Sequence, residues 1–278
     1  MGVIKFQKVK SAPTFRKIAL GSWNSVGDPS VYGLIELEMS PALKYIEETD
    51  KRENVKITPS HLVGKAVAQV LKQRPEINGM IRLGRLYLRE SVDVFYQVNI
   101  PGREGDPIGK ANLSGTVIRA ADKLSVAEIS RQLTQKSEMV RTGKDKEINR
   151  SLSQLSLVPW RLMKTVLNVS SFLNYDFNWN LNFLGFPSDP FGSVMITNVG
   201  GMGVEVAWAP LVPFARVPLL LTVGAIRPTP WAVGNKVEVR PVMKIGVTFD
   251  HRFIDGSHAA AMSYQFKKCF EDPETYLV

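Results

Sequence analysis

The chain has 278 residues, of which 44% are hydrophobic and 22% charged, as in a soluble globular protein with a sizeable core. Its single cysteine excludes a disulfide framework and a cysteine-based metal site, and it predicts a reducing, cytoplasmic compartment. The formal charge of +9 comes from scattered Lys and Arg, so a basic surface is expected rather than a nucleic-acid partner. The first residues also lack the apolar core of a signal peptide.

The predicted elements begin with a strand and two helices. Residues 33–39 place apolar side chains on one face and glutamates on the other, which is the pattern of a strand. Ser40 and Thr58 can each cap a helix that has proline in its first turn. The second of these helices carries an apolar stripe at helical spacing and is predicted to stop at Pro75.

Strands and helices then follow in mixed order. Residues 91–100 alternate as a strand does, and Ser125 with Glu128 has the spacing of a capping box at the start of another helix. After a strand-rich region, residues 237–251 form a long strand that Pro241 is expected to interrupt or bend, and a final helix closes the chain.

This order of elements predicts an α/β protein, an α+β two-layer sandwich with helices packed on a mixed sheet, rather than a doubly wound parallel fold. The sequence contains no internal repeat and no disordered linker long enough to separate domains. Residues 1–278 are therefore predicted to form a single domain.

Residues 156–187 stand apart, because they are rich in aromatic and aliphatic side chains and also contain five asparagines. A membrane span needs about 20 predominantly apolar residues, and Arg161, Lys164 and Asp176 argue against one. A segment packed on its own fold or at a subunit interface is the favoured interpretation. The alternative is a short amphipathic helix at about 158–169 that lies on a partner or on a bilayer surface.

Histidine is the side chain whose ordinary pKa best suits proton transfer near neutral pH, and the chain has three. His61 is interpreted as a surface or partly buried residue of a helix, and His258 as a first-turn residue without an obvious partner. His251 is the strongest candidate, because it follows a long strand at the loop where reactive groups commonly stand. Asp255 lies four residues further on, and Gly256 is expected to make the turn.

Other chemistries fit the sequence less well. Asp250, His251, Asp255 and His258 could be drawn as metal ligands, but no metal-site spacing such as HExxH occurs, and no metal is predicted. The sequence also lacks the G-x-S-x-G of a nucleophile elbow and a glycine-rich phosphate loop. Cys269 lies in the pattern of the last helix and is expected to be buried. His251 would then be a general base that acts directly on a substrate thiol, hydroxyl or amine.

The segment "DHRFIDG" (250–256) resembles the D-H-R-x-x-D-G signature of the catalytic domain of 2-oxoacid dehydrogenase acyltransferases, within the chloramphenicol acetyltransferase-like superfamily. Four further segments are similar to that family in the expected order: "ITPSHLVGKAVAQVLKQRPEINGM", "GTVIRAADKLSVAEIS", "VMITNVGGMG" and "CFEDPETYLV". The resemblance covers nearly the whole chain apart from an atypical hydrophobic insertion at about 146–190. It implies the chloramphenicol acetyltransferase-like fold.

The resemblance also implies a chemistry. His251 would take the proton from the thiol of coenzyme A or dihydrolipoamide, and Thr197 would donate a hydrogen bond to the oxyanion of the intermediate. Asp255 would organise the histidine loop, with Arg16 as its candidate partner. Arg252, with Asp250 and Gly256, would support the motif structurally. Coenzyme A or acyl-coenzyme A is the implied substrate, and the residues that bind it stay unassigned.

The family packs as trimers, so the resemblance implies a homotrimer or a multiple of trimers whose histidine and hydroxyl donor meet across a subunit boundary. The sequence starts almost directly with the catalytic domain, without lipoyl and peripheral-subunit-binding domains. A lipoyl group is therefore expected from a separate lipoyl-carrying protein, if at all. The alternatives are an amine, alcohol or lipid acceptor in place of the lipoyl thiol, and a trimeric scaffold that has lost turnover. Residues 156–187 could line an acceptor pocket, cap the trimer or touch a membrane.

Overall fold

The computed structural model describes residues 5–8, 28–100, 112–184 and 187–277. The strands in these ranges are β1 (Phe6–Lys8), β2 (Ser30–Glu38), β3 (Gly79–Arg82), β4 (Arg85–Arg89), β5 (Val94–Ile100), β6 (Asn112–Ile118), β7 (Val194–Asn198), β8 (Leu219–Val223), β9 (Arg227–Val233) and β10 (Lys236–Asp250). The α-helices are α2 (Ser40–Glu53), α3 (Pro59–Gln73), α4 (Val126–Arg141), α5 (Lys146–Ser156), α6 (Trp160–Ser171), α7 (Gly256–Glu271) and α8 (Pro273–Tyr276).

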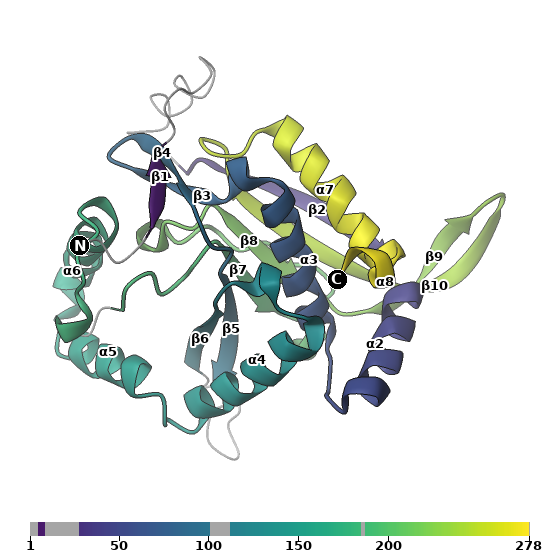
Figure 1. Cartoon of the computed structure of the whole chain (residues 1–278), viewed down its shortest axis with the longest axis horizontal. Helices are drawn as coiled ribbons and strands as arrows, with labels where there is room; N and C mark the ends of the chain where they lie inside the picture. Colours follow the sequence, from purple (N-terminus) through teal and green to yellow (C-terminus); the bar gives the residue numbers. More distant parts are fainter. Residues whose placement is uncertain (1–4, 9–27, 101–111, 185–186, 278) are drawn as a thin grey trace.

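The main sheet has the strand order β2-β10-β8-β7-β5-β6. Strand β7 runs parallel to β5 and β8, whereas the other neighbours on this path are antiparallel. Strand β9 pairs with the first half of β10, and the two extend beyond the body of the molecule as an arm (Figure 1). Strands β1, β4 and β3 form a small antiparallel sheet. The predicted mixed sheet is therefore confirmed.

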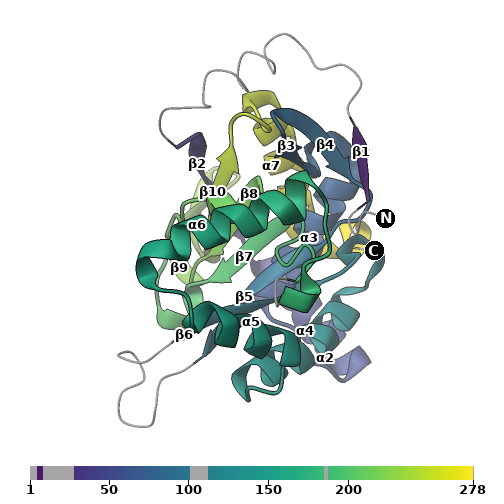
Figure 2. The ribbon, with the colours of Figure 1, turned by 90° about the vertical axis from the view of Figure 1, so that its left-hand side faces the viewer.

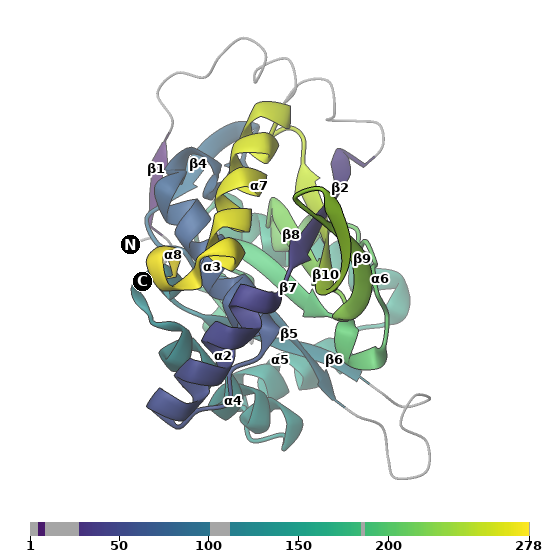
Figure 3. The same ribbon diagram turned by 90° about the vertical axis from the view of Figure 1, so that its right-hand side faces the viewer.

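One face of the main sheet is covered by helices. Helix α3 packs on β7 and β8, α4 packs on β5 and β6, and α7 packs beside β2. Figure 3 shows α7, α8 and α2 gathered on the β2 side of this layer. The apolar stripe predicted for α3 is buried in the core, where each leucine or valine contributes about 1.5–3 kcal/mol: Leu62, Val63, Ala66, Val67, Val70 and Leu71.

The helix starts follow local sequence signals with one exception. Thr58 and Ser125 occupy the N-cap positions of α3 and α4, as predicted, and both helices have capping boxes. Ser40, in contrast, is the first residue of α2, and Met39 is its N-cap. The amide of Met39 is held by the carbonyl oxygen of Pro241 at 2.8 Å, so strand β2 leads directly into the helix.

Pro241 was predicted to interrupt or bend the last strand. Interruption is wrong, because β10 runs unbroken from Lys236 to Asp250. Pro241 lies opposite Pro228 of β9, and β2 joins β10 only from Val242 onward. Two prolines can face each other in a ladder without loss, since a non-hydrogen-bonded pair needs no N–H group from either residue.

The second face of the sheet is crossed by the chain that follows β7. The carbonyl oxygen of Glu205 lies where a Cβ on Gly224 would stand, at 1.9 Å, and that of Ala207 lies 2.0 Å from the Cβ position of Gly246. The hydroxyl of Thr222 donates to the Ala207 carbonyl oxygen. Strand β8 and most of the second half of β10 are consequently buried.

The predicted insertion contains α5, α6 and a π-helical turn at Phe172–Asp176. Figure 2 shows α6 lying across the outside of the molecule, in front of the sheet. Three ion pairs among the described residues attach the segment to the body: Asp176 with Arg216 at 2.8 Å, Asp189 with Arg119 at 3.6 Å, and Asp189 with Arg89, a pair that is almost completely buried. Within the described ranges, no helix has the length and apolar character needed to cross a membrane.

Candidate active site

His251 lies in a tight turn directly after β10. Its amide donates to the carbonyl oxygen of Pro29 at 2.9 Å, and the amide of Ile254 donates back to the carbonyl oxygen of Asp250 at 2.8 Å. Phe253 and Ile254 are buried in the core, so the turn is anchored at both ends. The backbone of His251 is therefore fixed by the strand before it and by the core after it, while its side chain is half-buried.

The imidazole of His251 is oriented by a contact within the same turn. Its Nδ1 lies 3.0 Å from the carbonyl oxygen of Ile254. A carbonyl oxygen can only accept, so Nδ1 carries the proton in the neutral ring and Nε2 carries the lone pair. This tautomer presents Nε2 as the basic atom, which is the arrangement that a general base needs.

The residues on either side of His251 bind one another. Asp250 is buried and accepts hydrogen bonds from the backbone amide of Arg252 at 2.9 Å and from its guanidinium at 3.1 and 2.8 Å. This bidentate contact joins the residues on either side of His251. Such charge-assisted pairs are among the stronger hydrogen bonds in proteins.

Asp255 is the N-cap of α7 and accepts a hydrogen bond from the amide of His258 at 3.0 Å. His258 has this partner, contrary to the sequence expectation, because it stands at the third helical position and completes a capping box with Asp255. Gly256 does not make the turn: it is the first residue of α7, and a Cβ there would meet nothing within the chain. Arg16, the predicted partner of Asp255, lies outside the described residues.

Thr197 is half-buried on β7, in register with Thr222 of β8. Its neighbour Ile196 faces the helix-covered core, so Thr197 faces the opposite side of the sheet, as Thr222 does. Within the part of the chain that the structure describes, its hydroxyl has no hydrogen-bond partner. That hydroxyl can therefore donate to a group brought in from outside the chain.

One chain does not bring Thr197 and His251 together. Thr197 is in register with Thr222, which is in register with Gly246 of β10, and His251 follows Gly246 by five residues (251 − 246). At ordinary strand dimensions the two residues are separated by about 16 Å along the strands and about 10 Å across them, or about 19 Å in all. If Thr197 and His251 are to contact the same reacting group, one of the two must therefore come from a second copy of the chain.

A groove of about 470 Å³ lies next to the end of β7, between α3, α4 and β5. Asn198 donates to the hydroxyl of Ser60 in its wall at 2.6 Å. His61 also lines the groove and is buried rather than at the surface, and burial lowers its pKa to about 4. Its Nδ1 accepts from the amide of Thr58 at 3.1 Å, which leaves a neutral ring with its proton on Nε2.

His61 and Asn198 are positions that sequence reasoning did not connect to the site. The signal for His61 was available: it stands three residues after the capping Thr58, the spacing at which a side chain can reach back to the N-cap amide. The pairing of Asn198 with Ser60 joins residues 138 positions apart, and no local pattern indicates such a contact.

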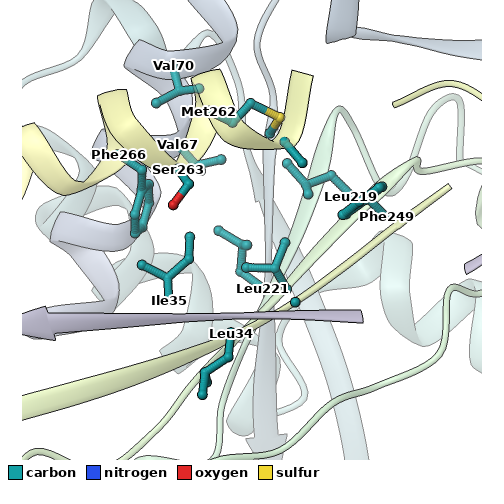
Figure 4. A pocket seen from close by; sticks show the side chains of 13 residues that line it. Leu34, Ile35, Val67, Val70, Leu219, Leu221, Phe249, Met262, Ser263 and Phe266 are labelled. Carbon is teal, nitrogen blue, oxygen red and sulfur yellow. The ribbon is translucent and has the colours of Figure 1, made fainter. Parts of the chain in front are cut away.

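A smaller cavity of about 130 Å³ lies beneath α7, between that helix, α3 and strands β2, β8 and β10. Figure 4 shows side chains such as Ile35, Leu221 and Phe266 converging on it from these elements, with Ser263 as the one polar side chain among them. Phe249 lines it two residues before His251. This space suits only an apolar group.

Two other chemistries receive no support from the described residues. No group of three or more His, Cys, Asp or Glu side chains in those ranges is arranged to hold a metal ion. Cys269 is buried in α7, as predicted, and burial raises the pKa of its thiol to about 11, so the thiolate is scarce near neutral pH.

The fold is shared with solved acyltransferase cores. A probable dihydrolipoamide acetyltransferase from Listeria monocytogenes superimposes with a TM-score of 0.64 at 17% identity, over 97% of this chain and 96% of that one. The cubic core of the pyruvate dehydrogenase multienzyme complex superimposes with a TM-score of 0.66 at 18% identity, over 98% of this chain and 95% of its own. The fold is thus that of a dihydrolipoamide acyltransferase core.

The sequence makes the assignment more specific. The family model for 2-oxoacid dehydrogenases acyltransferase (catalytic domain) matches residues 7–151 and 191–278, and the chain belongs to that family. Residues 152–190, most of the predicted insertion, fall outside the match. The resemblance noted in the sequence and the predicted fold class are confirmed.

Curated relatives include the dihydrolipoyllysine-residue succinyltransferase component of the 2-oxoglutarate dehydrogenase complex. That of Haemophilus influenzae is 26% identical over 249 residues, which are 87% of this chain and 48% of the relative. The human mitochondrial counterpart is 25% identical over 82% of this chain and 40% of its own length. The chain thus spans about half the length of the curated relatives it matches.

Proposed function

We propose that the chain transfers an acyl group between coenzyme A and a dihydrolipoyl thiol at a site shared by two copies of the chain. His251 is the general base and Thr197 the oxyanion donor. The observation that carries this proposal is the contact of His251 Nδ1 with the Ile254 carbonyl oxygen, which turns Nε2 into the basic atom of a rigidly held ring.

The reaction follows from these two groups. Nε2 of His251 takes the proton of the acceptor thiol, and the thiolate attacks the carbonyl carbon of the acyl thioester. Negative charge collects on the carbonyl oxygen, to which the Thr197 hydroxyl donates a hydrogen bond. The tetrahedral intermediate then expels the thiolate of the first carrier, which recovers the proton from the imidazolium. The histidine ends neutral, and the acyl group has moved from the sulfur of the first carrier to that of the acceptor.

The separation of about 19 Å between Thr197 and His251 along the sheet supports a site built from two copies. We therefore propose a homotrimer or a multiple of trimers, since a closed ring gives every copy one such contact. The solved relatives that form cores of multienzyme complexes are consistent with this. Coenzyme A is the proposed acyl carrier, and a separate lipoyl-carrying protein is the proposed source of the second thiol.

One relative bears on the residue roles. A crystallographic and enzymatic study of the dihydrolipoamide acetyltransferase from Azotobacter vinelandii, 19% identical to this chain, concerned a serine, a histidine and an asparagine in its catalytic mechanism. The histidine and the asparagine are four positions apart, as His251 and Asp255 are here. The aspartate at 255 is a difference, and we propose that it positions the histidine loop from the N-cap of α7.

Acyl transfer by the purified chain tests the proposal. With acetyl- or succinyl-coenzyme A and free dihydrolipoamide, we expect a new thioester and free coenzyme A in equal amounts. His251→Ala should lower kcat by about 10²–10⁴-fold, because the base is lost. Thr197→Ala should lower it by about 10²–10³-fold, whereas Thr197→Ser keeps the donor and should retain most of the rate.

Two results would replace this function by another. Transfer to small amines or alcohols but not to dithiols would identify a non-lipoyl acceptor. An absence of transfer from any acyl-coenzyme A, with no response to His251→Ala in any acyl-transfer assay, would identify a scaffold without turnover. The circular dichroism spectrum and the thermal midpoint of each variant show that a lost rate is not lost folding.

A further inference from the structure

The insertion carries a group of exposed apolar side chains. Of the nineteen large hydrophobic side chains that are exposed in the described part of the chain, seven lie between residues 157 and 183. We call this group the outer face of the insertion: Leu157, Leu162, Val169, Phe172, Phe177, Trp179 and Phe183. So dense a group on one short segment marks an interaction site rather than ordinary scattered exposure.

Helix α6 carries both partly buried and exposed apolar side chains. Met163 and Val166 are partly buried, and Ser171 is buried and accepts a hydrogen bond from the guanidinium of Arg216 at 3.2 Å, so this side faces the body of the protein. Leu162 and Val169, seven residues apart, lie at the edge of this side next to Val166 and are 54% and 51% exposed. Figure 2 shows α6 as the outermost element on its side of the molecule.

Aromatic rings extend the apolar stripe beyond the end of α6. Phe172 meets Phe177 edge to face, with ring centroids 5.1 Å apart, and Phe177 meets Trp179 at 5.6 Å. Although they contact one another, these rings stay exposed, Trp179 by 55%. Their mutual packing holds them in place before any partner arrives, so little side-chain freedom is lost on binding.

The exposed charged side chains of the segment between residues 148 and 188 are positive. Arg161 and Lys164 are exposed on α6 beside the apolar stripe, and exposed Arg150 donates to the carbonyl oxygen of Phe183. Between residues 148 and 188 the only acidic side chain is Asp176. Asp176 is buried and paired with Arg216, so it does not offset the cations at the surface. A partner for this face must therefore combine apolar and anionic character.

We propose that the outer face of the insertion binds the surface of an anionic lipid bilayer. Leucine, phenylalanine and tryptophan enter the boundary between headgroups and acyl chains, and flanking Lys and Arg contact the anionic headgroups. A second copy docked through the same face would set the Arg161 and Lys164 of both chains against each other. The helix is too short and too polar to cross the bilayer, so α6 lies along its surface.

Co-sedimentation of the whole chain with vesicles tests this. The probes are vesicles of phosphatidylcholine alone and of phosphatidylcholine with about 30% phosphatidylglycerol. We expect binding to the second kind only, and weaker binding as salt rises. Arg161→Gln with Lys164→Gln should weaken it about thirtyfold. Phe177→Ser with Trp179→Ser should weaken it by at least about tenfold.

Matched controls show whether vesicle binding depends on this face or only on the total charge and the exposed apolar area of the protein. Lys123→Gln with Lys267→Gln removes the same two charges from exposed positions elsewhere and should leave binding nearly unchanged. Val237→Ser with Val239→Ser, on the arm, removes two side chains that are 75% and 73% exposed and should do the same. Acyl transfer in solution should be unaltered by the insertion variants, which shows that they are folded.

Three results would overturn the proposal. The first is equal binding to both kinds of vesicle. The second is anionic-vesicle binding that the insertion variants and the controls weaken alike. The third is a change of oligomeric state, or a raised KM for the acyl acceptor, in Phe177→Ser with Trp179→Ser while vesicle binding stays at its original strength. In that case the face is covered by another copy of the chain or lines the acceptor site.

Discussion

The three histidines differ in what their ring nitrogens contact. Nδ1 of His251 lies against a carbonyl oxygen and must donate, whereas Nδ1 of His61 accepts from a backbone amide. Nδ1 of His258 lies 3.0 Å from the carboxylate of Asp255 as part of a helix cap. Because the position of the proton follows from these contacts, His251 presents Nε2 as a base and His61 does not. The place of His251 after a long strand made it the strongest candidate, but the sequence does not specify the ring contacts.

His61 predicts a specific pH dependence of stability. Burial lowers its pKa to about 4 in the folded chain, while the unfolded chain takes up the proton near pH 6.5. The free energy of unfolding should therefore fall as the pH falls from about 6.5 to about 4, by about 3 kcal/mol in total from this residue, and should be independent of it above that range.

The variant His61→Gln isolates this contribution. Glutamine at the third helical position can keep the capping box with Thr58 but does not titrate. Urea unfolding of both proteins at about pH 7 and about pH 4.5 should show a smaller loss of stability in the variant. Equal losses in the two proteins would mean that His61 is protonated as readily in the folded chain as in the unfolded one.

At the scale of single elements, local patterns predict much of this fold. The buried stripe of α3 and the capping box of α4 depend on residues three or four positions apart, and both are found where they were expected. The features that were missed depend on distant partners. Met39 replaces Ser40 as the N-cap because its amide binds Pro241, and Pro241 is tolerated because its neighbour in the ladder is another proline.

The glycines that lie beneath the crossing chain give a prediction for the sheet. Gly246→Ala would place a Cβ 2.0 Å from the Ala207 carbonyl oxygen and should lower the free energy of unfolding by about 1–3 kcal/mol or more. Gly256→Ala is the control, since it meets nothing within the chain and removes a glycine from a helix, so stability should be unchanged or slightly raised. Urea denaturation of the two variants measures both effects. Equal stabilities of the two variants would show that the crossing chain moves aside at no cost in free energy.

For the molecule as a whole, the candidate site illustrates the limit of a motif. The seven residues at 250–256 locate the histidine turn, because strand, turn and helix cap are all local features. The distance to Thr197 depends on the order of β7, β8 and β10 in the sheet, which no local pattern specifies. The shared site came from the family resemblance, and the strand register supports it independently.

A site shared between copies has a measurable consequence. His251→Ala and Thr197→Ala chains are each expected to be nearly inactive as homo-oligomers. In mixed trimers of the two chains, about a third of the wild-type rate should return, because each such ring has one boundary at which one chain supplies an intact histidine and its neighbour an intact threonine. Activity of the mixed oligomers, measured after co-purification on two tags, checks this. Mixed oligomers as inactive as the parents would locate the site within single chains.

The ion pair between Arg89 and Asp189 also determines how the insertion can be removed. Arg89 belongs to the small sheet of the family core, but its partner stands just inside the segment that the family model leaves unmatched. A shortened chain without residues 152–190 would lose the carboxylate that binds the Arg89 guanidinium, at a cost of about 3–5 kcal/mol if that guanidinium stays buried. Excision by protein engineering would thus have to replace Arg89 with an apolar residue, and any evolutionary loss of the segment would face the same coupled change.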